Sequence, residues 1–136
     1  MNVINNIKEG VKNKINKYKD KNFVWEQKNK MTLEERKERS QSIMDKYENR
    51  IPVICQTSSD LPNLERKKYL VPDDLSLVNF NYVVRKRIKV SAETSIYFFI
   101  GNKLLPSSLT MYQIYNKYKD EDGFLYIYIA AENTFG

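Results

Sequence analysis

The segment IPVICQ at residues 51–56, followed by KYLV at residues 68–71, decides the fold of this 136-residue chain. The first segment is short and rich in β-branched residues, which is typical of a buried strand. Turn-forming residues at 58–62 separate the two segments, so together they predict a hairpin. Pro72 ends the second strand and a basic run precedes it, and both features favour an edge position in a sheet.

A helix is predicted next, from a cap at Ser76 to about residue 89. Its apolar residues recur three or four positions apart, as the inward face of a helix requires. These residues are Leu77, Phe80, Val84 and Ile88. Basic residues gather in the last turns, where cations complement the helix dipole. We interpret them as a solvated helix end rather than a nucleic-acid surface.

The rest of the chain supplies two more strands and a short helix. Residues 96–100, IYFFI, contain no polar residue and predict a central strand covered on both faces. A loop at 103–108 and a short helix at 111–118 follow, and a final strand at 124–129 has two usable faces. From residue 51 onward this order is the β-grasp arrangement seen in ubiquitin. We therefore predict an α+β fold, a ubiquitin-like β-grasp with additional N-terminal helices and a four-stranded mixed sheet.

The N-terminal part differs in composition from the rest. Residues 1–30 contain eight lysines and three acidic residues, whereas residues 31–136 contain 15 basic and 14 acidic residues. We therefore divide the chain into a basic amphipathic extension with a first helix, at 1–30, and a ubiquitin-like domain at 31–136. The domain includes a preceding helix and a C-terminal tail. Most of the net charge of +6 belongs to the extension, so it says little about the domain.

The extension has the pattern of an amphipathic helix at residues 1–22, with lysines mostly outside the apolar stripe. The stripe consists of Ile4, Ile7, Val11, Ile15 and Tyr18. Such a helix can lie on an anionic membrane, pack on its own domain or stay frayed, and the sequence leaves these alternatives open.

A second helix is predicted from residue 33 to about residue 47. Thr32 is its expected N-cap, and Glu35 would complete a capping box. Because the helix is strongly charged, it should lie on the surface and bury one narrow apolar strip. That strip would consist of Leu33, Ile43, Met44 and Tyr47.

Several function classes are excluded by composition. The chain has no histidine, which rules out histidine-based catalysis and histidine-ligated zinc. Its single cysteine, Cys55, lies in an apolar run, which favours a small buried side chain and a reducing compartment. Its four glycines form no phosphate-binding loop. No apolar stretch is long enough to span a membrane. We expect a protein that is not an enzyme and holds no metal or cofactor.

Seven stretches resemble the GABARAP-type autophagy modifiers, ubiquitin-like proteins that are conjugated to phosphatidylethanolamine. They occur in order, with ordinary spacing, over residues 32–136, and together they are far more specific than any one alone. They are KYENRIPVI, ERKKYLVPDDL, VVRKRI, IYFFIGNKLLP, MYQIY, KDEDGFLYIYI and ENTFG. The last stretch ends at Gly136, whose carboxylate no Cβ crowds, which suits a terminus that is joined to another molecule.

The resemblance implies a conjugation cycle in which the chain is the substrate. A cysteine protease exposes Gly136 where needed and later removes the lipid. An E1-like activating enzyme uses ATP to activate this glycine, and an E2-like conjugating enzyme passes it to the lipid amine. The product would mark autophagosome or vesicle membranes and recruit cargo receptors and adaptors, whereas the unconjugated protein would be cytoplasmic. The alternative is a non-conjugated peptide-binding adaptor with an organelle-specific role.

The resemblance also implies two pockets beside the edge strand for an aromatic-x-x-aliphatic motif. The aromatic pocket would consist of Ile43, Pro52, Lys68, Leu70 and Phe124. The aliphatic pocket would consist of Tyr69, Val71, Pro72, Leu75, Phe80 and Val83. Acidic residues that flank the motif would meet Arg50, Arg66, Lys67, Lys68 and Arg87. For Leu75, Phe80 and Val83, packing in the core is an equal alternative.

The chain departs from the family pattern in a few places. Arg39 stands where an acidic residue is common near the aromatic pocket, so peptides that prefer a base there should bind poorly. The loop at 57–63 is shorter than the pattern, and the segment before Leu33 is longer. The long basic extension is unusual, and our hypothesis is that it lies on anionic membrane and aids conjugation or tethering.

Overall fold

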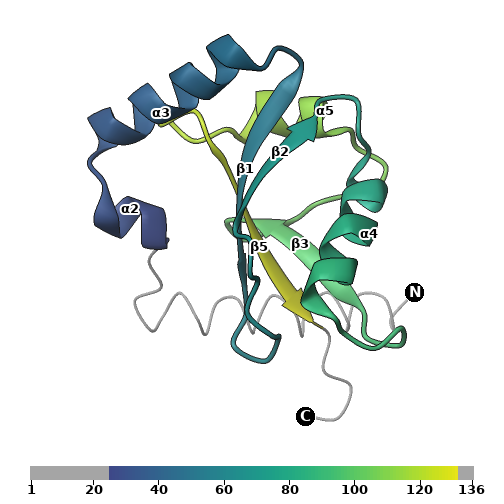
Figure 1. The fold of residues 1–136 in the computed structure, drawn as a ribbon. Helices are drawn as coiled ribbons and strands as arrows, with labels where there is room; N and C mark the ends of the chain where they lie inside the picture. The colour runs from purple at the N-terminus through teal and green to yellow at the C-terminus, as the bar shows by residue number, and fades with distance from the viewer. Residues whose placement is uncertain (1–24, 132–136) are drawn as a thin grey trace.

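A computed structural model describes residues 25–131, so the predicted helix at 1–22 and Gly136 lie outside the described part of the chain. Its helices are α2 (Glu26–Lys30), α3 (Leu33–Lys46), α4 (Leu77–Ile88) and α5 (Met111–Tyr118). Its strands are β1 (Arg50–Thr57), β2 (Lys68–Pro72), β3 (Ile96–Ile100), β4 (Lys103–Leu104) and β5 (Leu125–Ala131). Figure 1 shows the helices arranged around a strongly twisted sheet.

The strands form one mixed sheet in the order β2-β1-β5-β3-β4. β1 runs antiparallel to β2 and parallel to β5, and β3 runs antiparallel to β5. The predicted hairpin and the edge position of β2 are thereby confirmed. β5 is the central strand, and every one of its residues is buried.

One prediction about the sheet is wrong. The sequence predicts four strands, but residues 103–104, expected in a loop, form a fifth. A turn at Gly101, where φ is 58°, returns the chain so that β4 pairs with the end of β3. A strand of two residues is too short to show an alternating pattern, so the sequence could not indicate it. The segment 96–100 is an interior strand, paired with β5 and β4, although β5 occupies the middle position. Its side chains pack in clusters on both faces of the sheet, as predicted.

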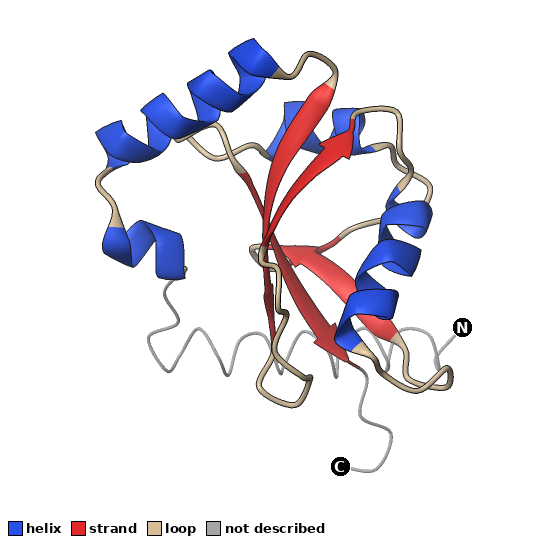
Figure 2. Cartoon of the chain, in the orientation of Figure 1, coloured by secondary structure: helices blue, strands red, loops and turns tan. Residues whose placement is uncertain are grey.

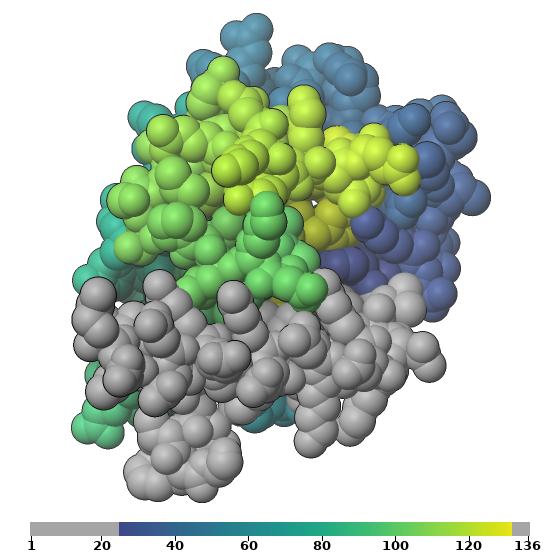
Figure 3. Space-filling view, turned by 180° about the vertical axis from the view of Figure 1, so that it is seen from behind, coloured from purple at the N-terminus to yellow at the C-terminus, as the bar shows by residue number. Residues whose placement is uncertain are grey.

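Helices cover both faces of the sheet (Figure 2). α4 and α5 pack on one face, and α2 and α3 lie on the other. The predicted inward stripe of α4 is confirmed, since Phe80 and Val84 have no exposed area. On the opposite face Phe124 and Tyr126 pack against Trp25 and Ile43. Seen from behind, residues of α2 lie beside residues of β5 although they come from opposite ends of the described chain (Figure 3).

Side-chain caps begin the longer helices. The hydroxyls of Thr32 and Ser76 each accept the backbone N–H three residues ahead, at 3.2 and 3.3 Å. Thr110 forms a full capping box at the start of α5. These contacts confirm the predicted starts of α3 and α4, since a hydroxyl cap satisfies a backbone donor that has no partner within the helix. Lys89, in the left-handed region with φ 60°, ends α4.

The buried strip of α3 differs from the prediction. The two buried residues of this helix are polar, Arg36 and Ser40, with 8% and 4% of their surface exposed. Of the predicted strip, Leu33, Ile43 and Met44 are half-buried, while Tyr47 is exposed. The prediction is therefore confirmed only in part, because α3 also packs its polar residues against the turn that precedes β5, at residues 120–123.

Candidate functional site

An apolar pocket of about 720 Å³ opens between α3 and the β1–β2 hairpin, and we call it the α3–β2 pocket. It is lined by Glu38, Arg39, Ser42, Ile43, Pro52, Val53, Ile54, Arg66, Lys68, Tyr69, Leu70 and Phe124. This wall contains all five residues predicted for the aromatic pocket, namely Ile43, Pro52, Lys68, Leu70 and Phe124. They come from α3, the hairpin and the residue just before β5, so the tertiary structure brings three distant segments together.

The position of the pocket follows from the strand period of β2. Neighbouring residues of a strand point to opposite sides of a sheet. Tyr69 and Val71 are buried in the core on the α4 side. Leu70 lies between them and lines the α3–β2 pocket on the other side. Its partner across the hairpin is Pro52, which lines the same pocket.

The backbone of β2 is open on one side. Among the described strands its only partner is β1, in a register that runs from Pro72 opposite Arg50 to Lys68 opposite Ile54. The outer N–H and C=O groups of β2 therefore form an edge to which an extended peptide can add as a further strand. The α3–β2 pocket lies directly beside this edge.

The mouth of the pocket is positively charged. Arg39, Arg66 and Lys68 are exposed lining residues, and Glu38 is the one acidic residue in the wall. None of the three cations forms an ion pair with another residue between positions 25 and 131. Cations in this state attract negatively charged groups and offer donors to a partner.

A smaller pocket of about 370 Å³ adjoins the first, between α2 and β1, and shares Arg39, Ile54 and Lys68 with it. Its charges are largely paired. The carboxylate of Glu26 accepts hydrogen bonds from Lys30 at 2.7 Å and from Lys67 at 2.8 Å. These hydrogen bonds, with the charges of the two lysines, lower the pKa of Glu26 to about 2. The contact between Glu26 and Lys67 joins α2 to the hairpin.

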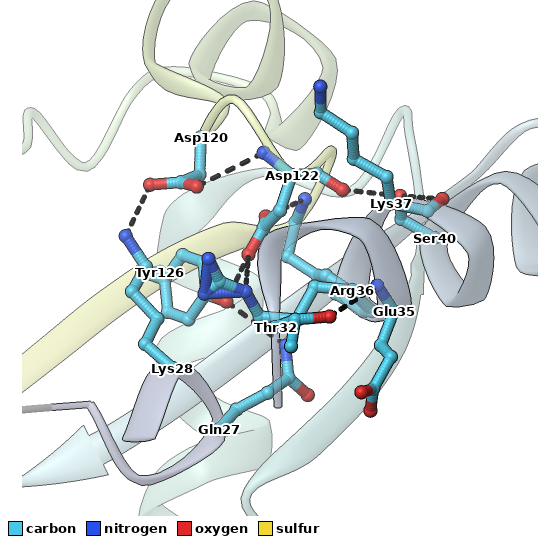
Figure 4. A network of polar contacts seen from close by, with 11 residues as sticks. Gln27, Lys28, Thr32, Glu35, Arg36, Lys37, Ser40, Asp120, Asp122 and Tyr126 are labelled. Atoms are coloured by element: carbon cyan, nitrogen blue, oxygen red, sulfur yellow. Dashed lines mark hydrogen bonds and ion pairs between the residues drawn. The ribbon is translucent and has the colours of Figure 1, made fainter. Parts of the chain in front are cut away.

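A buried polar network holds α2 and α3 against the turn before β5 (Figure 4). The hydroxyl of Tyr126 donates to Asp122 Oδ2 at 2.5 Å and accepts from Gln27 Nε2 at 3.0 Å. Arg36 Nε lies 3.4 Å from the same carboxylate oxygen. The hydroxyl of Ser40 donates to the backbone carbonyl of Asp122 at 2.5 Å. The network therefore fixes α3, and with it the α3 wall of the α3–β2 pocket.

Burial dominates the electrostatics of this network. The side chain of Asp122 has no exposed area, and burial raises its pKa, while the nearby Arg36 favours its charged form. Burial, followed by the hydrogen bond to Asp122, also raises the pKa of Tyr126. The sequence did not indicate this network, because the stretch DEDG at residues 120–123 is typical of an exposed turn. The available signal was the placement of Arg36, Ser40 and Ile43 on one face of the helix.

The family profile described as "Autophagy protein Atg8 ubiquitin like" matches residues 35–136. The chain belongs to the Atg8 family. Autophagy-related protein 8 of Kluyveromyces lactis is 48% identical over 111 residues, which cover 80% of this chain and 90% of that protein. Autophagy-related protein 8c of Arabidopsis thaliana is 54% identical over 106 residues, which cover 76% and 89% of the two chains. The resemblance found in the sequence is thereby confirmed.

Solved Atg8 structures share the fold. The crystal structure of Trypanosoma brucei ATG8 matches with a TM-score of 0.77 and 39% identity, over 84% of this chain and all of that one. Plasmodium falciparum Atg8, in complex with a Plasmodium falciparum Atg3 peptide, matches with a TM-score of 0.70 and 34% identity, over 78% and 95% of the chains. The ubiquitin-like, α+β character predicted for the domain is therefore confirmed.

The residues predicted for the aliphatic pocket of this Atg8 chain fall into two groups. Tyr69, Val71 and Phe80 are buried in the core, where the rings of Tyr69 and Phe80 meet edge to face at 5.5 Å. Pro72 and Leu75 are half-buried, and Val83 is 40% exposed. A partner side chain can therefore contact the residues of the second group directly. The residues of the first group lie in the core beneath that surface.

The basic residues predicted to meet acidic flanks are all exposed, but they differ in their contacts. Arg50, Arg66 and Arg87 have no ion-pair partner within the described part of the chain, whereas Lys67 pairs with Glu26. Another basic residue near the end of α4, Arg85, holds the following loop in place. Its guanidinium donates to backbone carbonyls of the following loop, including that of Thr94 at 2.6 Å.

The remaining chemistry of the described residues is sparse. Cys55 is fully buried, and desolvation raises the pKa of its thiol, as the prediction of a buried side chain requires. Residues 25–131 contain no group of three histidine, cysteine or acidic side chains arranged to hold a metal ion. Within the same range, none of the helices combines the length and apolar character needed to cross a membrane.

Proposed function

We propose that this Atg8-family chain is a ubiquitin-like modifier joined through Gly136 to the amine of phosphatidylethanolamine, and that the anchored domain recruits receptors and adaptors to autophagic membranes. In this proposal the chain performs no catalysis. It is cytoplasmic before conjugation and lies on autophagosome or vesicle membranes afterwards. Membership of the Atg8 family supports the conjugation step.

The observation that carries the docking half is the α3–β2 pocket beside the open edge of β2. A peptide that adds to this edge places residues separated by three positions on opposite sides of the sheet, because a strand alternates. An aromatic side chain can then enter the pocket beside Leu70 while the aliphatic residue turns toward Val83 and Leu75 on the α4 side. An aromatic-x-x-aliphatic motif therefore fits this surface in both spacing and polarity.

The positions of the pocket and the aliphatic surface along β2 also determine the direction in which a bound peptide runs. The α3–β2 pocket lies beside Lys68 and Leu70, and the aliphatic surface lies beside Pro72 and Leu75, further along the chain. A partner in which the aromatic residue comes first therefore runs parallel to β2. Residues before the aromatic one then pass the exposed cation Arg66.

The proposed partners act either on the C-terminal glycine or on the surface beside β2. An E1-like activating enzyme, which uses ATP, an E2-like conjugating enzyme and a cysteine protease act on Gly136, and cargo receptors dock beside β2. The complex of Plasmodium falciparum Atg8 with an Atg3 peptide supports an E2-like partner by analogy. The chain itself would need no cofactor.

Reconstitution tests the conjugation step. The chain is incubated with matching activating and conjugating enzymes, ATP and liposomes that contain phosphatidylethanolamine, and lipid attachment is followed by mass spectrometry. We expect a lipid adduct with the native chain and none with Gly136→Ala. Liposomes of phosphatidylcholine alone are the control, because they offer no amine. Equal recovery of unmodified protein from native and variant chains would contradict conjugation and favour a purely binding adaptor.

A further inference from the structure

The polar groups at the mouth of the α3–β2 pocket are mostly hydrogen-bond donors. Arg39, Arg66 and Lys68 carry only N–H groups at their ends, and guanidinium and ammonium groups cannot accept a hydrogen bond. The floor beneath them is apolar and includes Ile43 and Phe124. An aromatic side chain that fills this pocket therefore buries its ring against carbon and presents its outer edge to donors.

These donors are available to a partner. Two lysines of the adjoining pocket, Lys30 and Lys67, already have a carboxylate partner, since both pair with Glu26. By contrast, Arg39 has no hydrogen bond or ion pair to another described residue, although it lines both adjoining pockets. Among residues 25–131, therefore, no side chain competes with a bound partner for this guanidinium.

The acidic residue of the wall lies on a different margin. Glu38 and Ser42 also line a shallow surface on the outer side of α3, together with Gln41 and Asp45. Arg39 instead faces the side of α3 that continues to the hairpin. Glu38 and Ser42 are therefore shared with a surface formed by α3 alone, whereas Arg39 is shared with the pocket beside the hairpin.

The three aromatic side chains differ in what their edges offer. The tyrosine hydroxyl can accept a hydrogen bond, the indole N–H of tryptophan can only donate, and phenylalanine does neither. An N–H donor placed against guanidinium groups leaves its own hydrogen bond unmade, which is unfavourable in a desolvated site. We propose that the α3–β2 pocket of this chain selects tyrosine as the aromatic residue of its partner motif, with Arg39 as the residue that determines this preference. The inference rests on the docking proposed above.

Ring size and stacking do not decide between the three. A volume of about 720 Å³ accommodates any of the rings. A guanidinium can stack on each of them, so stacking raises the affinity of all three peptides. The hydrogen bond to a charged donor distinguishes tyrosine, because charge-assisted hydrogen bonds are stronger than neutral ones.

The test uses three synthetic peptides that are identical except for tyrosine, tryptophan or phenylalanine in an aromatic-x-x-leucine motif. Their dissociation constants are measured by calorimetry on the full chain and on Arg39→Glu. We expect tyrosine to bind about tenfold more tightly than tryptophan to the native chain, which is about 1.4 kcal/mol. In Arg39→Glu the preference for tyrosine should be lost, since the new carboxylate accepts a hydrogen bond from the indole N–H and from the tyrosine hydroxyl alike.

Lys37→Glu is the matched control, because it makes the same charge change on the same helix at an exposed residue outside the pocket wall. It should leave the ratio of the tyrosine and tryptophan affinities unchanged. Thermal melting of both variants confirms that they fold. A tryptophan peptide that binds the native chain as tightly as the tyrosine peptide, or a ratio that Arg39→Glu does not alter, overturns the tyrosine preference alone. If none of the peptides binds the native chain, the docking proposal fails with it.

Discussion

The two faces of the sheet are closed in different ways. Under α4 and α5 the contacts are apolar, and Phe80 and Val84 have no exposed area. Under α2 and α3 the contacts include a buried carboxylate, Asp122, an arginine, Arg36, and several hydrogen bonds. The core under α4 is closed at Phe80 and Val84, whereas the polar face leaves the α3–β2 pocket open beside it. The apolar face therefore contributes packing, whereas the polar face combines buried polar contacts with the open pocket on which the proposed docking rests.

The largest effect should follow from a cavity on the apolar face. Phe80→Ala removes a fully buried ring that packs against Tyr69 and Phe98. We expect the free energy of unfolding to fall by about 3–5 kcal/mol, because the lost contacts are not replaced. Urea denaturation measures this change. Tyr82→Ala, at a residue of the same helix that is 63% exposed, is the control and should change stability by less than about 0.5 kcal/mol. Similar losses in both variants would refute the contrast.

A second test concerns the polar face. Asp122→Ala removes the acceptor of Tyr126 and the charge beside Arg36, and leaves both groups buried. We expect a loss of about 2–3 kcal/mol, since buried polar groups without partners are destabilising. Hydrogen exchange should also increase in α3 more than in α4, because the network joins α3 to the sheet. If hydrogen exchange became faster to the same extent in α3 and α4, the loss of the network would destabilise the whole domain, and the two faces would not differ in this respect.

A smaller effect is expected on binding than on folding. Leu70→Asp places a charge in the wall of the α3–β2 pocket at a half-buried position. A peptide that carries the aromatic-x-x-aliphatic motif should bind it more weakly by more than about 1 kcal/mol, as truncations of central contact residues do. Phe124→Ala should weaken binding as well, but Phe124 is only 3% exposed, so its effect on stability must be measured in parallel. Unchanged affinity in both variants would place the binding site elsewhere.

The smallest effect concerns the ion pairs that join α2 to the hairpin. The pKa of Glu26 is lowered from 4.5 to about 2 by Lys30 and Lys67. Since the folded-state pKa is the lower one, this attraction is present above pH 4.5 and is lost as the pH falls toward 2. Nuclear magnetic resonance of the carboxyl carbon should give a midpoint near pH 2. Lys67→Ala should raise it, and a native midpoint near 4.5 would show that α2 is not held in this way.

The apolar face could be predicted from sequence, because its signals are local. The stripe of α4, including Phe80 and Val84, appears as a repeat of three or four residues and is buried as predicted. The hydroxyl caps at Thr32 and Ser76 form as expected, whereas a full capping box is found at Thr110 and not at Thr32. Each of these features depends on residues close together in the chain, so the sequence alone contains the relevant spacing.

The polar face could be predicted only in part. The resemblance to a family placed Ile43, Leu70 and Phe124 in one site, and the structure brings them into one pocket wall. The sequence did not indicate that Arg36 would be buried against Asp122, nor that β4 would form. A charged residue has the same appearance in a sequence whether it is solvated or paired inside the protein.

The sequence by itself determined the order of the elements other than β4, the edge position of β2, the inward stripe of α4 and the resemblance to the family. Those conclusions rest on periodicity, turn chemistry and ordered motifs, which are properties of the chain read along its length. Tertiary structure decided which polar groups would be satisfied and which would remain available. Asp122 meets Arg36 in the interior. Arg39, three residues further along the same helix, has no ion-pair partner among the described residues. Pairing of this kind depends on contacts between segments far apart in the chain, and no local pattern encodes it.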